Sequence, residues 1–339
     1  MYIDYYGLRD YPFRITPDTD YLYMSKAHSR AKAYMEYAIF NREGFVVITG
    51  EIGSGKTTLI KKFLTELDEN VIVAKIFQTQ LDEVELLQAI LVEFGLNPFS
   101  AKKVELLNMI NQFLVDSYLS GKQVLLIIDD AQNLTKRVLE EVTMLSGVET
   151  QKEKILHVIL VGQPELNHKL ESHDMEQLLQ RVSLRYHVRA LTEEEARGYI
   201  EHRLSIAGVD KQLFDQEIYP DIYKYTGGIP RLINTICDTS LTCAYADNKD
   251  RVDAEEFESA ISELQWKTYE ETHKELSDQS MHNDSLYHNS QSHLSDINPD
   301  IAKELLHSAY SPIASRALVE ISKQLKRIAD QLDSNIRKK

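Results

Sequence analysis

The chain has few cysteines, no long apolar run and no excess of basic charge among its 339 residues. Its two cysteines, Cys237 and Cys243, are too few for a disulfide framework and are not spaced like metal ligands, so we expect both to be reduced core residues. No apolar run approaches the roughly 20 residues that cross a bilayer. The runs at residues 45–49 and 124–128 have the length of buried strands. The first residues lack the basic and apolar regions of a secretory signal, so we expect a cytoplasmic protein.

The charge balance is acidic, with 53 Asp and Glu against 38 Lys and Arg and a net charge of −15. Phosphate neutralisation needs clustered basic side chains, so this balance disfavours a protein that coats nucleic acid with its whole surface. A local path lined by Lys61, Lys62, Lys102 and Lys103 stays open. The hydrophobic content of 43% is that of a globular protein, and the length allows one large or two modest folded units with a tail.

Short β-branched runs alternate with amphipathic stretches between residue 45 and about residue 188, which is the pattern of a parallel sheet covered by helices. Apolar residues recur at three- and four-residue spacing in residues 84–94 and 106–114, so we expect each stretch to be a helix with one buried stripe. The sequence therefore predicts an α/β fold, with strands at residues 45–49, 71–76, 124–128, 155–161 and 183–188.

Strand signals stop near residue 190, and helical patterns replace them. Thr192 stands before three glutamates like a helix N-cap, whereas Gly227 and Gly228 mark a break between helices. We therefore expect a core domain over residues 1–190 and a smaller helical lid domain over residues 191–268.

The end of the chain changes character twice. Residues 269–300 are rich in serine, histidine and acids, which predicts a polar flexible linker; their four histidines are spaced too irregularly to favour a metal site. Residues 301–339 carry eight basic against four acidic residues, and apolar three- and four-residue spacing returns after Pro312. We expect an amphipathic helical tail there. The tail could dock on a partner, on a sister subunit or on an anionic membrane face, and all three stay open.

A phosphate-binding loop of the Walker A type is predicted by the pattern G-x-x-x-x-G-K-[ST], with an apolar strand before it and a helix-forming run after it. Its glycines let backbone N–H groups face phosphate oxygens at a helix N-terminus. Lys56 supplies a positive charge to the β- and γ-phosphates, and Thr57 offers a hydroxyl to Mg²⁺. A glycine-rich turn that happens to carry a lysine is the alternative. The pattern thus indicates an ATP and Mg²⁺ site made by Gly50, Glu51, Ile52, Gly53, Ser54, Gly55, Lys56, Thr57 and Thr58.

A pair of acids follows the apolar run at residues 124–128, in the manner of a Walker B segment. A buried strand there places Asp129 at the carboxyl edge of the sheet beside the phosphate-binding loop, where its carboxylate can hold Mg²⁺. Asp130 is then available to orient or deprotonate the attacking water. The alternative is that both acids cap a helix.

Further motifs carry a family resemblance over about residues 1–266. They are residues 6–13, 17–18 and 21–23 and His28 in an N-terminal segment 1–40, and residues 128–134, 161–166, 180–186 and 226–234. As an ordered set they resemble the AAA+ ATPases of the branch that contains the ExeA-like general secretion pathway ATPases and the TnsC-type transposition regulators. The resemblance implies a P-loop AAA+ parallel sheet flanked by helices, followed by a small helical lid.

The resemblance also implies roles for residues outside the Walker A and Walker B segments. Gln163 matches sensor 1, which holds the attacking water or senses the γ-phosphate; a glutamine that satisfies a turn is the alternative. Arg181 or Arg185 matches the arginine finger that reaches the nucleotide of a neighbouring subunit, unless both are ion-pair arginines. Arg231 follows Pro230 at a helix start and matches the sensor 2 arginine, which points from the lid to the phosphates.

One position departs from the family pattern. The family usually has glutamate where this chain has Asp130, and aspartate is one methylene shorter. The water-activating carboxylate therefore stands farther from its target, so we expect slow hydrolysis with ATP binding preserved.

Within this branch, the chain resembles the soluble secretion ATPases encoded beside exosortase and exopolysaccharide genes. The resemblance implies an ATPase whose assembly into a ring or filament supports envelope secretion, polysaccharide export or pilus biogenesis, with peripheral contact at the inner membrane through the tail. We do not expect the membrane span and peptidoglycan-binding module of the longest secretion relatives. Two alternatives stay open: a DNA-bound regulator of a transposase-like partner, which the charge disfavours, and a slow nucleotide switch.

Overall fold

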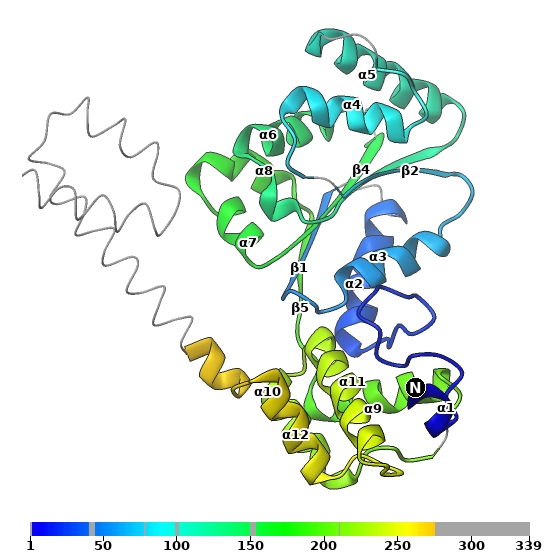
Figure 1. Cartoon of the computed structure of the whole chain (residues 1–339). Coiled ribbons are helices and arrows are strands. Elements are labelled where there is room, and N and C mark those ends of the chain that lie inside the picture. The colour runs from blue at the N-terminus through cyan, green and yellow to red at the C-terminus, as the bar shows by residue number, and fades with distance from the viewer. Residues whose placement is uncertain are drawn as a thin grey trace, which may run out of the picture. The chain divides into compact units, whose positions relative to one another are not determined.

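The computed structural model describes residues 2–40, 45–77, 79–98, 102–149, 154–209 and 211–274 (Figure 1). The chain up to Trp266 forms one compact unit, and a second unit begins at Lys267. In the second unit the first described residues of the predicted linker, 269–274, are helical. The rest of the predicted linker and the whole predicted tail, residues 301–339, lie outside the described residues.

Five parallel strands form one sheet in the order β2-β3-β4-β1-β5. The three inner strands are mostly apolar and almost wholly buried because helices cover both faces of the sheet. All five strands predicted from the sequence are confirmed within one residue at each end. They are β1 (Phe45–Gly50), β2 (Val71–Ile76), β3 (Gln123–Ile128), β4 (Leu156–Gly162) and β5 (Leu184–Val188).

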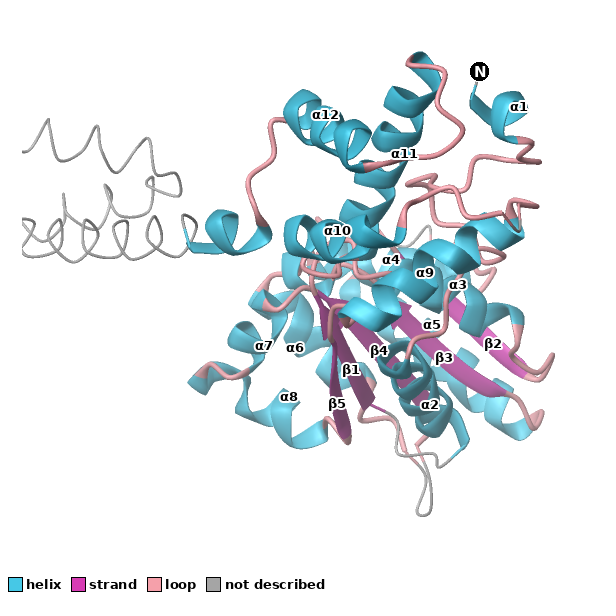
Figure 2. Ribbon diagram, turned by 90° about the horizontal axis from the view of Figure 1, so that it is seen from below, coloured by secondary structure: helices cyan, strands magenta, loops and turns pink. Residues whose placement is uncertain are grey.

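Successive residues of the inner strand β1 pack on opposite faces of the sheet. Val46 and Ile48 share a core with α2 (Lys26–Phe40) and α3 (Lys56–Thr65). Phe45 and Val47 belong to the core on the other face. Figure 2 shows the sheet with helices around it. The helices of the second core are α4 (Glu83–Glu93), α5 (Lys103–Leu119), α6 (Lys136–Leu145), α7 (Glu165–Leu170) and α8 (Glu176–Arg181).

The remaining helices form a third apolar core after β5. Thr192 caps the first of them as predicted, and the break predicted at Gly227 and Gly228 separates two helices there. Cys237 and Cys243 are free and buried, as the sequence indicates. The helices are α9 (Glu193–Ile206), α10 (Tyr219–Thr226), α11 (Pro230–Ala246) and α12 (Ala254–Leu264), with short 3₁₀ turns η1 (Ala131–Asn133), η2 (His173–Met175) and η3 (Gln216–Ile218) elsewhere in the chain.

The first residues of the chain pack with these late helices rather than with the sheet. Helix α1 (Tyr2–Tyr6) places Tyr2 and Tyr6 in the third core, and Phe13 meets the ring of Phe214 edge-on at 6.0 Å between ring centroids. Residues 1–40 are predicted to belong to the core domain, and of these α2 and Leu22 pack against the core on the sheet. The chain thus crosses from the helical part to the sheet between residues 13 and 26, and this crossing passes over the carboxyl edge of the sheet.

Candidate functional site

The phosphate-binding loop connects β1 to α3 in the predicted strand–loop–helix order. Gly53 and Gly55 both have left-handed backbones, with φ of 81° and 91°. A Cβ on Gly53 would stand 2.5 Å from the Cβ of Arg231, so glycine is what lets α11 rest on the loop. Gly55 is the N-cap of α3 and provides no side-chain hydrogen bond, so the first N–H groups of the helix remain free to face an anion.

Lys56 lies against the loop, with 8% of its surface exposed. Its Nζ donates hydrogen bonds to the carbonyl oxygens of Gly50 at 2.7 Å and Glu51 at 2.9 Å. Burial lowers the pKa of this ammonium group, whereas the nearby carboxylates of Asp129 and Asp130 act in the opposite direction. A phosphate oxygen carries more negative charge than either carbonyl, so the same ammonium group is suited to bind it.

Thr57 and Asp129 place a hydroxyl and a carboxylate side by side next to the loop. Thr57 Oγ1 donates a hydrogen bond to Asp129 Oδ2 at 2.8 Å, and the backbone N–H of Asp130 donates to Asp129 Oδ1 at 2.9 Å. Asp129 is 3% exposed, and this burial raises the pKa of its carboxyl group. A divalent cation would offset a charge that burial makes costly, and carboxylate and hydroxyl oxygens are ligands that Mg²⁺ prefers, so these two residues fit the predicted metal site.

Asp130 and Gln163 follow the adjacent strands β3 and β4, so they lie near each other at the same edge of the sheet. Asp130 has a left-handed backbone with φ of 50°, which turns its exposed side chain away from the strand direction. Both residues line one cavity together with Lys56 and Arg231. The backbone N–H of Arg231 donates to the carbonyl oxygen of Gly53 at 3.2 Å, so α11 touches the phosphate-binding loop directly.

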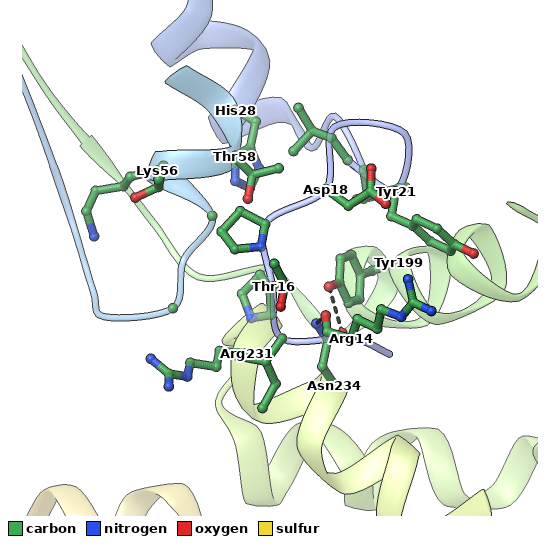
Figure 3. A pocket seen from close by; sticks show the side chains of 18 of the residues that line it. Arg14, Thr16, Asp18, Tyr21, His28, Lys56, Thr58, Tyr199, Arg231 and Asn234 are labelled. Carbon is green, nitrogen blue, oxygen red and sulfur yellow. Dashed lines mark hydrogen bonds between the residues drawn. The ribbon is translucent and has the colours of Figure 1, made fainter. Parts of the chain in front are cut away.

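The cavity has a volume of about 580 Å³ and lies between the sheet edge, α9, α11 and the crossing segment of the chain (Figure 3). Of the residues predicted from the sequence, those that line it are Ile52, Gly53, Gly55, Lys56, Thr57, Thr58, Asp130, Gln163 and Arg231. Gly50, Glu51 and Ser54 also belong to the loop but do not line the cavity. The carbonyl oxygens of Gly50 and Glu51 accept hydrogen bonds from Lys56, and Asp129 contacts the lining residue Thr57.

Residues that the sequence analysis did not predict as site residues form the opposite wall of the cavity. Arg203 of α9 is 6% exposed and donates hydrogen bonds to the carbonyl oxygens of Pro12 and Arg14 and, at 2.8 Å, to Tyr199 Oη. Tyr199 Oη in turn donates to Asn234 Oδ1 of α11 at 2.8 Å, a bond drawn in Figure 3. Asn234 Nδ2 donates to the carbonyl oxygen of Arg14 at 3.2 Å. The wall is therefore one network that joins two late helices to the crossing segment.

His28 supports the phosphate-binding loop from behind. Its ring Nε2 lies 2.9 Å from the carbonyl oxygen of Ser54, and its Nδ1 lies 2.7 Å from Ser25 Oγ. Because a carbonyl oxygen can only accept, Nε2 carries the proton and Nδ1 accepts from the hydroxyl group. Burial lowers the pKa of this imidazole, which agrees with a neutral ring. The sequence analysis noted His28 as part of a family motif, but nothing in the sequence showed its contact.

The two arginines predicted as finger candidates lie outside the cavity lining. Arg181 Nη1 donates to the carbonyl oxygen of Thr143 at 2.9 Å, and its side chain is partly buried. Arg185 on β5 pairs with Glu171 at 3.3 Å, and the two side chains are 36% and 58% exposed. The structure thus does not bring either residue to the cavity of its own chain.

Comparison with known proteins places this geometry among nucleotide-binding folds. Residues 40–170 match a family model described as an AAA domain. General secretion pathway protein A of Aeromonas hydrophila is 38% identical over 253 residues, which are 74% of this chain and 46% of that relative. The chain therefore spans about half the length of the curated relative that it matches.

Solved structures agree with the fold. The ORC2 protein of Aeropyrum pernix in ADPNP and ADP complexes superposes with a TM-score of 0.53 at 19% identity, over 70% of this chain and 66% of that one. Cdc6p of Pyrobaculum aerophilum superposes with a TM-score of 0.55 at 15% identity, over 77% and 70% of the two chains. At these identities the likeness shows the fold alone.

None of the helices in the described part of the chain combines the length and apolar character that a membrane span needs. The sheet order, the phosphate-binding loop and the matched structures agree with the predicted fold class. The chain thus has the P-loop AAA+ fold, and its likeness to general secretion pathway protein A supports an ExeA-like AAA+ ATPase.

Proposed function

We propose that the chain binds ATP with Mg²⁺ and hydrolyses it to ADP and phosphate. The observation that carries the proposal is the meeting of four groups around one cavity: Lys56 of the phosphate-binding loop, the Thr57–Asp129 pair, Asp130 and Arg231. A phosphate-binding loop alone indicates binding. The acid after β3 and the arginine from α11 add the two elements that hydrolysis needs, a base and a second positive charge.

Each of these groups has a place in the reaction. A water oxygen bonds to the γ-phosphorus while the bond to the β–γ bridging oxygen breaks, and the water loses a proton. Asp130 would orient that water and take up its proton, and Gln163 would hold the water or the γ-phosphate. Lys56 and Arg231 would offset the negative charge on the transferred group. Thr57 and Asp129 would hold Mg²⁺, which offsets charge on the β- and γ-phosphate oxygens when bound.

Phosphate release from ATP and Mg²⁺ by the intact chain tests this proposal. Replacing the carboxylate in Asp130→Ala should lower turnover by roughly 100-fold or more, because general-base catalysis contributes that much in other enzymes. ATP affinity, measured separately by calorimetry, should stay near that of the wild type. Asp130→Glu should be no slower than the wild type, since it restores the longer side chain typical of the family. Equal turnover in the wild type and Asp130→Ala would remove Asp130 from the chemistry.

We further propose that Arg185 is the arginine finger, contributed to the site of a neighbouring subunit in a ring or filament. Exposed ion pairs contribute little to stability, so Arg185 can leave Glu171 for a phosphate at small cost. Arg181, by contrast, would have to give up a carbonyl partner in the interior.

Mixing two inactive variants tests action between subunits. Arg185→Ala and Asp130→Ala should each be inactive alone, whereas a mixture should regain part of the turnover, because some interfaces then combine an intact Arg185 with an intact Asp130. Arg181→Ala serves as the matched control and should lose stability rather than turnover. A mixture that stays inactive would contradict action between subunits.

The cellular role that these features support best is an ATPase whose assembly serves envelope secretion or exopolysaccharide export from the cytoplasmic side of the inner membrane. The likeness to general secretion pathway protein A supports this role, although the chain spans 46% of that relative. Sedimentation with and without ATP would test assembly. Retention on duplex DNA with ATP at low salt would favour a DNA-bound regulator instead. A single turnover followed by arrest would favour a nucleotide switch.

A further inference from the structure

Gln132 stands between two residues of the proposed site and touches both. Its Nε2 donates a hydrogen bond to Asp130 Oδ1 at 3.2 Å, and its Oε1 accepts one from the backbone N–H of Gln163 at 3.0 Å. The orientation of this amide follows from its partners: the N–H of Gln163 can only donate, so the atom that faces it is the oxygen, and the nitrogen faces Asp130. One side chain thus links the loop after β3 to the loop after β4.

The surroundings of Gln132 hold it in this place. A Cβ on Gly162, the last residue of β4, would stand 2.8 Å from Gln132 Oε1, so a glycine there makes room for the amide. Lys169 of α7 donates hydrogen bonds from Nζ to the carbonyl oxygens of Gln132 at 2.6 Å and Leu134 at 2.8 Å. Lys169 thus holds the backbone of η1, and Gly162 leaves space for the side chain of Gln132.

The consequence concerns the carboxylate of Asp130. Asp130 lines the cavity, but its side chain can still rotate about χ1 and χ2. Because Oδ1 accepts from Gln132, Oδ2 would be the oxygen available to an attacking water. A base must be oriented as well as present, because a misplaced group loses much of its effect.

We infer that Gln132 is a positioning residue for the hydrolysis reaction, which orients Asp130 and ties it to the strand end that carries Gln163. This inference rests on the proposed function, since it needs Asp130 to act on water. Lys169 and Gly162 help to keep Gln132 in place: Lys169 holds the η1 backbone, and Gly162 leaves room for the amide.

The experiment compares turnover and ATP affinity in the intact chain carrying Gln132→Glu. Glutamate has the same shape and still accepts from the N–H of Gln163, but it offers no N–H to Asp130 and repels it. We expect turnover to fall roughly 10- to 100-fold with ATP affinity nearly unchanged. Asn133→Asp is the matched control: it changes the neighbouring amide of the same turn into a carboxylate, and Asn133 contacts Thr79 rather than the site. Its turnover should stay near that of the wild type.

A double variant separates orientation of Asp130 from a merely structural effect. If Gln132 acts through Asp130, then Asp130→Ala with Gln132→Glu should be no slower than Asp130→Ala alone, because the group to be positioned is already gone. Gly162→Ala, which pushes on the amide, should lower turnover in the same direction as Gln132→Glu. Additive losses in the double variant, or wild-type turnover in Gln132→Glu, would overturn the inference.

Failure of the proposed function gives a different result. If Asp130→Ala turns over like the wild type, the role of Asp130 fails and Gln132 has nothing to position. If Asp130→Ala is slow but Gln132→Glu is fast, the proposed function stands and only the inference about Gln132 is wrong. Circular dichroism of each variant confirms that the compared chains are folded.

Discussion

The two walls of the cavity are built in different ways. Most of the phosphate side comes from short segments that directly follow β1, β3 and β4, so a strand end or a helix start places each group; Lys56, for example, bonds to carbonyls five and six residues away. The opposite wall comes from segments far apart in the chain, because Arg203 bonds to the carbonyl of Pro12, 191 residues away. A short sequence motif therefore determines much of the phosphate side, whereas the opposite wall depends on the packing of the whole chain.

This difference implies that the two walls respond differently to substitution. A change on the phosphate side should alter binding or chemistry while the fold remains, because the strand ends are held by the sheet. A change in the opposite wall should loosen the crossing segment and the late helices together, because they share one hydrogen-bond network.

The largest effect is expected for Asp129→Asn on the phosphate side. The amide keeps the shape of the carboxylate but loses the charge that would hold Mg²⁺, so the Mg²⁺ concentration needed for half-maximal hydrolysis should rise by roughly 10- to 100-fold. Calorimetric binding of ATP in EDTA should change little. Equal Mg²⁺ requirements in the two proteins would show that Asp129 is not a metal-site residue.

The next effect is expected for Arg203→Met in the opposite wall. The substitution leaves two carbonyl oxygens and the Tyr199 hydroxyl without their donor, so the free energy of unfolding should fall by about 2–3 kcal/mol. Urea denaturation measures it. Arg197→Met is the matched control on the same helix, because the exposed Arg197 bonds to Glu201 on the surface, and it should leave the denaturation midpoint unchanged. Equal midpoints in both variants would show that the network does not hold the wall.

A smaller effect is expected for Tyr199→Phe. It removes one hydroxyl that accepts from Arg203 and donates to Asn234, while the ring stays in the core. The free energy of unfolding should fall by about 1 kcal/mol, less than for Arg203→Met. If the two losses were equal, the hydroxyl group and not the guanidinium group would hold the network together.

The smallest effect concerns pH and the ring of His28. Burial lowers the pKa of His28 in the folded state, so the unfolded chain takes up the proton first as pH falls. This group therefore leaves stability unchanged above its unfolded pKa of about 6.5 and lowers it progressively below that value. His28→Gln should lose this part of the pH dependence in urea denaturation between pH 5 and 8. Identical pH dependence in the wild type and His28→Gln would contradict the neutral, buried ring.

The sheet and the phosphate side could be predicted from the sequence, because periodicity, glycines and acids act within a few residues of one another. Lys56, Thr57 and Asp129 are placed by a strand end or a helix start, which the sequence indicates directly. The opposite wall could not be predicted in this way. Nothing in the residues around Arg203 or Asn234 shows that their partners are the carbonyls of Pro12 and Arg14, because only the packing of the whole chain brings them together.

Gln132 shows the limit of sequence reasoning most clearly. It lies two residues after Asp130 in a motif that the sequence analysis quoted, yet its role depends on the direction of its amide and on the space above Gly162. The finger candidates show a similar limit, since Arg181 and Arg185 are four residues apart and only their contacts separate them.

Calorimetric titration of the intact chain with ATP and Mg²⁺, with Lys56→Ala alongside it, tests directly whether the loop after β1 binds ATP. The wild type should bind one ATP per chain, and the variant should bind at least tenfold more weakly, because the ammonium group beside the loop is lost. Absence of binding to the wild type, or equal affinity in the two proteins, would show that this loop is not an ATP site.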